Sequence, residues 1–258
     1  MAAEFISRRS VLMRMAALVI APVASAARSE DVKLITDNGT GAMTRFAANV
    51  EGVRPAVILL HGSRGIELNP GAYIRHAEAL VAVGVDAYLV RYFSAADSSA
   101  LAVDASTSAS RDAYSATRFT AWADAVSLAI SEVRQRSECS GKIGLLGFSL
   151  GGYVAAATAA RDARVSALAV MYGGMPPMFV EGLSRLPPLL ALHGNADTIV
   201  PLSESERLVA LARKIGATAN LVVYPGKKHG FDFDASDPTT ADVVSRVARF
   251  FKSTLESA

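Results

Sequence analysis

The sequence predicts an α/β fold built on a mainly parallel sheet, and two observations carry this prediction. Short apolar segments of the kind that form buried strands alternate with longer segments that carry helix patterns. Residues 142–160 also place an apolar run, a glycine-rich turn and an alanine-rich stretch in succession. This succession is the pattern of a strand that leads through a sharp turn into a helix.

The elements follow in order along the chain. A turn signal at 37–41 lies between segments 32–36 and 43–48, which predicts two antiparallel edge strands. Apolar runs predict further strands at 56–60, 86–92, 143–146, 165–172, 189–192 and 220–224. Helical spacing of apolar residues, helix-forming composition and terminal glycines predict helices at 73–83, 117–136, 153–160, 203–215 and 241–255.

Two connections between these elements have their own character. Residues 94–115 are rich in serine and alanine and have no strand pattern, so we expect a loop or a small excursion near the carboxyl ends of the strands. Both a lid over a site and a solvated loop fit this segment. Prolines at both ends mark residues 176–188 as an irregular connection.

Length, composition and charge bound the class of protein. The 258 residues suffice for one domain, or at most two small ones, and 51% of them are hydrophobic, which provides a large core. The formal charge of +2 indicates no nucleic-acid partner. Cys139 is the single cysteine, so an intramolecular disulfide is excluded.

The first 26 residues have the pattern of an export signal. Segment 7–13 contains Arg8-Arg9 and resembles the twin-arginine motif, a short apolar run follows at 15–21, and Ala24-Ser25-Ala26 provides a cleavage site of the A-x-A type. The apolar run is too short to span a bilayer. We therefore expect a mature domain of residues 27–258 in the periplasm or outside the cell, after passage through the export machinery. A basic tail on a cytoplasmic protein is the alternative.

The glycine-rich turn predicts a nucleophile. Gly147-Phe148-Ser149-Leu150-Gly151 fits G-x-S-x-G between a predicted strand and a predicted helix, the context that this motif requires. A serine on such a strained turn presents its hydroxyl above the sheet, and the small residues at 147 and 151 let strand and helix approach closely. The N–H of Leu150, at the start of the helix, is placed to stabilise an oxyanion.

A serine hydroxyl needs a base, and the base needs an orienting partner. Asp197 and His229 follow the predicted strands at 189–192 and 220–224, so the chain order is Ser149, Asp197, His229. This order is expected when a G-x-S-x-G turn lies on an α/β-hydrolase sheet, where the strand ends share one edge. His61 and His193 also end strands and are rival bases, but they precede their partners in the chain.

The remaining candidates receive less weight. We expect His76 at the surface or in a groove, and Asp232 and Asp234, the rivals of Asp197, in solvent. A metal site formed by His229 and these two aspartates is conceivable, but no metal-binding spacing supports it. Cys139 is expected to be a small buried hydrophobic residue.

The loop after the first apolar strand supplies the second oxyanion donor. His61-Gly62-Ser63-Arg64-Gly65 offers closely spaced N–H groups, among which we favour that of Ser63, with Arg64 second. The Arg64 side chain is a candidate for binding an anionic group of the substrate. An exposed loop arginine is the equally good alternative.

Four motifs together resemble the dienelactone hydrolase family of α/β hydrolases over roughly residues 40–255. They are Leu60-His61-Gly62, the Gly147–Gly152 turn, His193-Gly194-x-x-Asp197 and His229-Gly230-Phe231. The resemblance implies the α/β-hydrolase fold with an eight-stranded, mostly parallel sheet and helices on both faces, a catalytic triad, and no cofactor. The enzymes that give the family its name carry cysteine at the nucleophile position, whereas this chain has Ser149.

The leading hypothesis is therefore a serine hydrolase that cleaves a small-molecule carboxylic ester or lactone through an acyl-enzyme. The catalytic residues would be Ser149, Asp197 and His229, the oxyanion donors Ser63 and Leu150, and no metal would take part. A peptidase or acyltransferase with the same triad is one alternative. A non-catalytic binding protein on the same fold is another, although a binding module has no need of a base in register with a serine.

Overall fold

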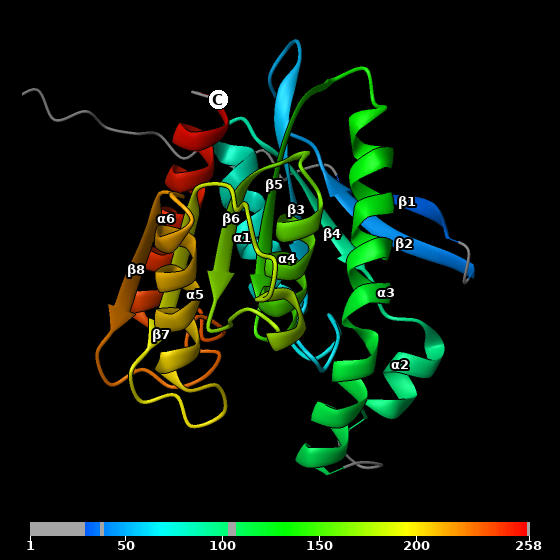
Figure 1. Cartoon of the computed structure of the whole chain (residues 1–258). Helices are drawn as coiled ribbons and strands as arrows, with labels where there is room; N and C mark the ends of the chain where they lie inside the picture. Colours follow the sequence, from blue (N-terminus) through cyan, green and yellow to red (C-terminus); the bar gives the residue numbers. More distant parts are fainter. Residues whose placement is uncertain (1–28, 37–38, 103–106, 257–258) are drawn as a thin grey trace, which may run out of the picture.

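A computed structural model describes residues 29–36, 39–102 and 107–256 (Figure 1). In this part of the chain, eight strands form one sheet in the order β1-β2-β4-β3-β5-β6-β7-β8. The strands are β1 (Ser29–Thr36), β2 (Gly39–Phe46), β3 (Arg54–Leu60), β4 (Asp86–Arg91), β5 (Cys139–Phe148), β6 (Val165–Met171), β7 (Leu189–Gly194) and β8 (Ala219–Tyr224). From β4 to β8 all neighbours are parallel, whereas β2 pairs antiparallel with both β1 and β4.

The mostly parallel eight-stranded sheet with helices on both faces is thus confirmed. One detail of the prediction is wrong. Both of the first two strands were expected at an edge, but only β1 forms an edge, because β2 lies between β1 and β4. The antiparallel pairing of these two strands is as predicted.

The helices cover both faces of the sheet, as Figure 1 shows. α3 (Ser108–Arg134), α4 (Leu150–Arg161) and α5 (Leu202–Lys214) pack on one face, and α1 (Pro70–Ala82) and α6 (Pro238–Glu256) pack on the other. The strands between them are buried on both sides, which explains their continuous apolar sequences. Each face has its own hydrophobic core, one containing Trp122 of α3 and the other Phe251 of α6.

The segment 94–115 is more regular than predicted. It contains α2 (Ala95–Ala100) and the first two turns of α3, which begins nine residues before the expected helix. Ser94 and Asp97 form a capping box at the start of α2. This local helix signal is not apparent from the serine- and alanine-rich composition of the segment. The expectation of a solvated loop is therefore corrected to two packed helices, α2 and α3, on either side of 103–106.

Buried Asp97 joins these two helices. Its carboxylate accepts hydrogen bonds from Ser94 of the cap and from Tyr114 (2.9 Å) and Arg118 (2.8 Å) of α3. Burial disfavours the charged carboxylate, but the bonds from Arg118 and Ser94 outweigh it and lower the pKa of Asp97 to about 2. The carboxylate therefore stays charged at neutral pH and holds α2 against α3.

The order of the strands defines where a site can form. The chain runs from β3 through α1 to β4 on one side and then crosses to β5 on the other side of β3. The loops that leave β3 and β5 therefore diverge to opposite faces, and such a switch point is the usual place for a ligand in an open parallel sheet. Ser63, the predicted oxyanion donor, lies in the loop after β3, and Ser149, the predicted nucleophile, directly follows β5.

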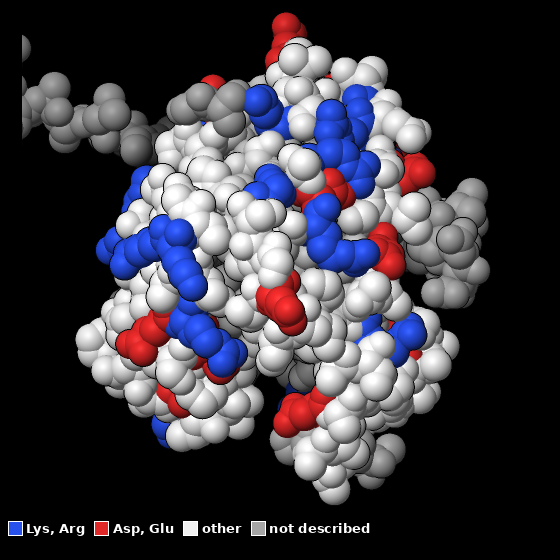
Figure 2. Space-filling model, viewed as in Figure 1, with Lys and Arg blue, Asp and Glu red and all other residues white. Residues whose placement is uncertain are grey.

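Two further expectations concern membranes and export. No helix among the described residues is long and apolar enough to cross a bilayer. The predicted export signal, residues 1–26, lies outside the described residues. On the face drawn in Figure 2, acidic and basic side chains lie next to one another in several places, and the lower edge is hollowed between the start of α3 and the start of α5.

Candidate active site

Ser149 lies on a strained turn between β5 and α4. Its backbone has φ of 53°, a left-handed conformation that is costly for a residue with a side chain, and its N–H donates to Met171 O at 2.9 Å. A Cβ at Gly147 would collide with the carbonyl of Gly151, and a Cβ at Gly151 would collide with that of Leu60. The two glycines therefore let β3, β5 and α4 meet at the serine, as the motif predicts.

The structure brings the three predicted residues together. His229 Nε2 lies 2.9 Å from Ser149 Oγ, and His229 Nδ1 lies 2.7 Å from Asp197 Oδ2. The carboxylate accepts from Nδ1–H, which leaves Nε2 free to accept the serine proton. The Asp197 side chain is fully buried, whereas that of His229 is 21% exposed. This arrangement can activate a serine hydroxyl.

The loops after β7 and β8 are tied together, and this places Asp197 beside His229. Asn195 N–H donates to Tyr224 O (3.1 Å), and Ala196 N–H donates to Lys227 O (3.0 Å). The side chain of Asn195 accepts from Gly226 N–H at 2.7 Å. Three bonds thus join two segments about thirty positions apart in the sequence.

Asp197 is held by its own loop and by a second histidine. Its Oδ1 accepts the N–H groups of Ile199 (2.8 Å) and Val200 (2.9 Å). His193 Nε2 donates to Val200 O at 2.9 Å and lies 3.3 Å from Asp197 Oδ2, while its Nδ1 faces Ser205 Oγ at 2.7 Å. Burial lowers the pKa of His193, so it remains neutral near pH 7. His193 therefore holds the Asp197 loop in place through its bond to Val200 O and its contact with the Asp197 carboxylate.

His61 also has a supporting position. It is buried, its Nδ1–H donates to Gly62 O at 2.8 Å, and its ring stacks on Tyr92 with centroids 4.3 Å apart. Burial lowers the pKa of His61 to about 4. Among the described histidines, it is His229 that lies within hydrogen-bond distance of the Ser149 hydroxyl.

Two expectations about polar residues are wrong. His76 is buried and not at the surface, because α1 turns it toward the loop after β8, where its Nε2 lies 3.1 Å from Asp232 Oδ2. Asp232 is likewise buried and not solvated, and it accepts a hydrogen bond from Tyr172 Oη at 2.8 Å. Asp234 is exposed, as predicted.

The metal hypothesis finds no support in this geometry. Asp232 points to Tyr172 and His76, and Asp234 bonds within its own turn to Ser236. In the described ranges, no three His, Cys, Asp or Glu side chains are grouped so as to hold a metal ion. Cys139 is partly buried at the amino end of β5, the end of the strand opposite to Ser149.

The two expected oxyanion donors adjoin the serine. Leu150 is the first residue of α4, so its N–H has no carbonyl partner within the helix. The loop after β3 lies against the nucleophile, because a Cβ at Gly62 would be 3.5 Å from Ser149 Cβ. The Gly62 N–H already donates to Tyr73 Oη (3.1 Å), which leaves the following N–H groups of the loop, first that of Ser63, as the available donors.

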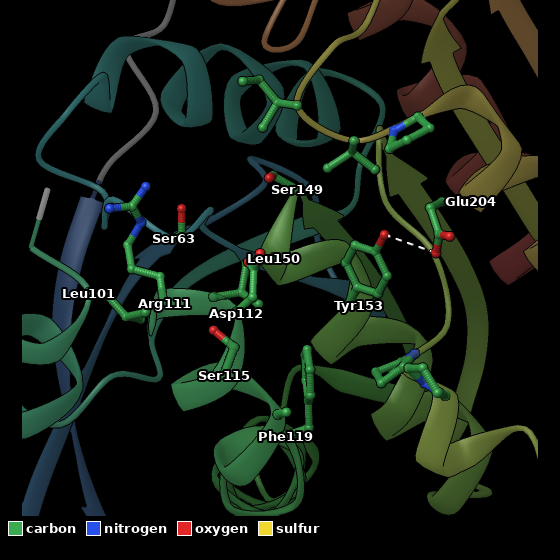
Figure 3. Close-up of a pocket in the computed structure, with 16 residues that line it drawn as sticks. Ser63, Leu101, Arg111, Asp112, Ser115, Phe119, Ser149, Leu150, Tyr153 and Glu204 are labelled. Carbon is green, nitrogen blue, oxygen red and sulfur yellow. Dashed lines mark hydrogen bonds between the residues drawn. The ribbon is translucent and has the colours of Figure 1, made fainter. Parts of the chain in front are cut away.

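Two cavities meet at Ser149, and they share Ser63, Arg111 and Ile199 in their walls. The first, which we call the Leu150 cavity, has a volume of about 460 Å³ and is shown in Figure 3. The second, which we call the His229 cavity, has a volume of about 440 Å³. Of these two cavities, the Leu150 cavity alone is lined by Leu101, Asp112, Ser115, Ala116, Phe119, Leu150, Tyr153, Pro176 and Glu204. The His229 cavity alone is lined by Arg64, Leu68, Tyr73, Tyr172, His229 and Phe233.

Sequence reasoning missed most of these lining residues. Tyr153 could have been found, because it follows Ser149 by four positions and so lies on the same side of α4. Its hydroxyl donates to Glu204 Oε2 at 3.1 Å across the Leu150 cavity (Figure 3). The sequence pattern gives no signal for Arg111 and Ser115, because both lie in the first two turns of α3, where the serine-rich composition favours a loop. Arg64 is exposed and lines the His229 cavity.

Comparison with known proteins agrees with this architecture. An isoprenylcysteine alpha-carbonyl methylesterase of Arabidopsis thaliana is 37% identical over 62 residues, 24% of this chain and 14% of that protein. A Synechocystis protein with the provisional description carboxymethylenebutenolidase is 27% identical over 128 residues, 45% of this chain and 52% of that protein. The crystal structure of a dienelactone hydrolase from Anabaena variabilis superposes with a TM-score of 0.68 at 19% identity, covering 89% of this chain and 99% of that one.

The family assignment rests on a longer match. The chain spans about half of the length of the Synechocystis relative, and less of the Arabidopsis one. The model of the dienelactone hydrolase family, in contrast, matches residues 43–255, which include strands β3 to β8 and every residue of the site. The chain belongs to the dienelactone hydrolase family.

Proposed function

We propose that this protein hydrolyses a carboxylic ester or lactone through an acyl-enzyme formed on Ser149. The observation that carries the proposal is the hydrogen-bonded chain from Ser149 through His229 to buried Asp197, built on a strained turn at the switch point of the sheet. Membership of the dienelactone hydrolase family and the methylesterase and carboxymethylenebutenolidase descriptions of its relatives support the same reaction class.

The geometry suits two successive acyl transfers. Ser149 Oγ attacks the ester carbonyl while its proton passes to His229 Nε2, and Asp197 stabilises the resulting imidazolium. When the tetrahedral intermediate collapses, the bond to the alcohol oxygen breaks and His229 gives that oxygen its proton. Water then attacks the acyl-enzyme with His229 as base, which releases the acid and restores the serine. The N–H groups of Leu150 and Ser63 stabilise both oxyanions.

The position of His229 indicates which part of the substrate each cavity binds. The leaving oxygen must lie within reach of His229 Nε2 to be protonated, so the alcohol portion occupies the cavity that His229 lines. The acyl portion extends to the other side of Ser149, along Leu150 and into the Leu150 cavity. Phe119 and Pro176 give this cavity apolar walls, and the Tyr153–Glu204 pair provides a polar site. On the alcohol side, Arg64 is placed to bind an anionic substituent.

Serine at position 149 favours general ester hydrolysis. A thiolate needs no strong base next to it, whereas a serine hydroxyl depends on the imidazole that lies 2.9 Å away. We therefore propose carboxylic esters, rather than dienelactone, as the preferred substrates.

We also propose that the precursor is exported by the twin-arginine route. The support is the order of Arg8-Arg9, the apolar run and Ala24-Ser25-Ala26. Mass spectrometry of the protein from its native host should find an N-terminus near Ala27, and replacement of both arginines by lysine should leave precursor in the cytoplasm. Functional protein that retains residues 1–26 would contradict export.

Loss of the nucleophile should abolish hydrolysis. Ser149→Ala should lower kcat on a simple p-nitrophenyl ester by about 10⁴–10⁶, as loss of a triad serine does elsewhere. A fluorophosphonate probe should label the parent protein at Ser149, which peptide mapping identifies. Full activity of the alanine variant, or an adduct on another residue, would disprove the proposal.

The identity of the orienting carboxylate can be tested with a matched pair of variants. Asp197→Asn should keep the fold and lower kcat by roughly 10⁴, because the amide cannot stabilise the imidazolium or hold the required tautomer. Asp234→Asn is the control, and it should change kcat less than about tenfold because Asp234 is exposed. A thermal melt checks folding, and an active Asp197→Asn variant would show that this carboxylate is not the partner.

The cavity assignment predicts two independent changes of specificity. Ala116→Trp, at an exposed position of the Leu150 cavity, should lower kcat/KM for long acyl chains relative to acetyl by about tenfold with the alcohol held constant. Leu68→Trp, at a half-exposed position of the His229 cavity, should do the same for bulky alcohols in a series of acetates. If instead each variant affects the other series, the acyl portion occupies the His229 cavity and the alcohol portion occupies the Leu150 cavity.

A further inference from the structure

Tyr172 makes a third contact with His229, besides those of Asp197 and Ser149. The centroids of the Tyr172 and His229 rings are 4.7 Å apart, with the rings inclined at 62°. The same tyrosine packs against Phe231 at 5.9 Å and donates its hydroxyl to Asp232 at 2.8 Å. One buried side chain therefore contacts three of the four consecutive residues of the loop that carries the histidine.

Asp232 is fastened as firmly as Tyr172. Its side chain is fully buried, and its two oxygens face Tyr172 Oη and His76 Nε2, at 2.8 and 3.1 Å. A carboxylate only accepts, so both partners donate. Burial raises the pKa of Tyr172 well above its usual value, so the phenol keeps the proton that it donates. Arg75 binds the same loop through the carbonyls of Asp232 and Phe233, at 3.0 and 2.9 Å.

The backbone of Tyr172 is strained, and its turn lies next to the strained turn of the nucleophile, Ser149. Its φ of 38° makes it, with Ser149, one of two non-glycine residues in the described chain with positive φ. The two turns are neighbours, because Ser149 N–H donates to the O atom of Met171, the residue before Tyr172. Such a conformation is energetically costly and is retained where the surroundings enforce it, most often at functional sites.

The hydrogen bonds to Asp197 and Ser149 hold the imidazole at its two nitrogens, and small changes in the χ1 and χ2 torsions of His229 still allow the ring to tilt. The Tyr172 ring packs beside the imidazole and restricts this tilting on the side that it occupies. The imidazole must keep its orientation while it accepts the serine proton and delivers it to the leaving oxygen, and small misplacements of catalytic groups are costly.

We propose that Tyr172 and Asp232 form a positioning pair for His229, in which the bond between them holds the Tyr172 ring against the imidazole. The inference rests on the proposed role of His229 as the base. Neither residue of the pair touches the serine proton. Both act through the orientation of the ring that does.

Tyr172→Phe tests the pair, and the chain provides a matched control. The variant keeps the ring but loses the bond to Asp232, so we expect kcat on a p-nitrophenyl ester to fall about tenfold with KM unchanged. Tyr224→Phe loses a tyrosine–aspartate bond of similar length, from Tyr224 Oη to Asp242 at 2.9 Å, and its ring packs on the same Phe231 at 5.0 Å. Because the Asp242 side chain is 40% exposed, this variant should lower the Tm less than Tyr172→Phe does, and it should change kcat less than twofold. Equal kcat for Tyr172→Phe and parent, or an equal loss in both variants, would overturn the proposal.

Variants of Asp232 provide an independent test, should Tyr172→Phe not fold. Asp232→Asn keeps an oxygen that accepts from Tyr172, and His76 can accept from the new amide by moving its proton to Nδ1, which has no hydrogen-bond partner in the described chain. We expect its kcat within threefold of the parent. Asp232→Leu, which fills the site without an acceptor, should lower kcat as Tyr172→Phe does. A folded Asp232→Leu variant with full kcat would refute the pair.

Ser149→Ala, measured in the same assay, separates this inference from the proposed function. If Ser149→Ala retains the activity of the parent, the proposed function fails whatever the Tyr172 variants show. If hydrolysis depends on Ser149 but Tyr172→Phe and Asp232→Leu match the parent, only the positioning pair fails.

Discussion

The close approach of β3, β5 and α4 is the constraint on which the site depends. Side chains at Gly147 and Gly151 would collide with backbone carbonyls, so the strand-to-helix turn can be this tight only with glycine at both positions. The same tightness forces Ser149 to a positive φ and places its hydroxyl above the sheet edge. The first N–H of α4 and the loop after β3 are thereby brought to one point beside the serine, where charge develops during acyl transfer.

Around this turn, backbone hydrogen bonds fix the positions of the loops that carry Asp197 and His229. The loops of Asp197 and His229 are joined by main-chain bonds, and Asp197 is oriented by two N–H groups of its own loop. Buried, neutral His193 supports the loop from below. A carboxylate held in this way needs no reorganisation when the imidazole becomes charged, which is the electrostatic advantage of a preorganised site over water.

The cavity proposed for the acyl group is lined in part by a different region of the fold. Six of the sixteen residues that line the Leu150 cavity belong to the first half of α3 or to the segment before it, and the bonds of Asp97 to Tyr114 and Arg118 hold this region together. The family match covers these residues, but they lie outside the motifs that contain Ser149, Asp197 and His229. In the proposed function, the loops at the carboxyl ends of the strands carry the chemistry, and α3 adds part of the wall that contacts the acyl group.

The sequence by itself determined the alternation of strands and helices, the turn at Ser149 and the chain order of Ser149, Asp197 and His229. All of these depend on contacts between residues close in sequence, or on the rule that parallel strands end at one edge. Only the tertiary structure decided that His76 and Asp232, 156 positions apart, meet in a buried cluster with Tyr172. Burial of a polar side chain depends on which distant partners satisfy it, and no local pattern reports that. The helices within 94–115 were missed for a related reason, because serine-rich segments favour turns and the capping and packing that make them helical become visible only in three dimensions.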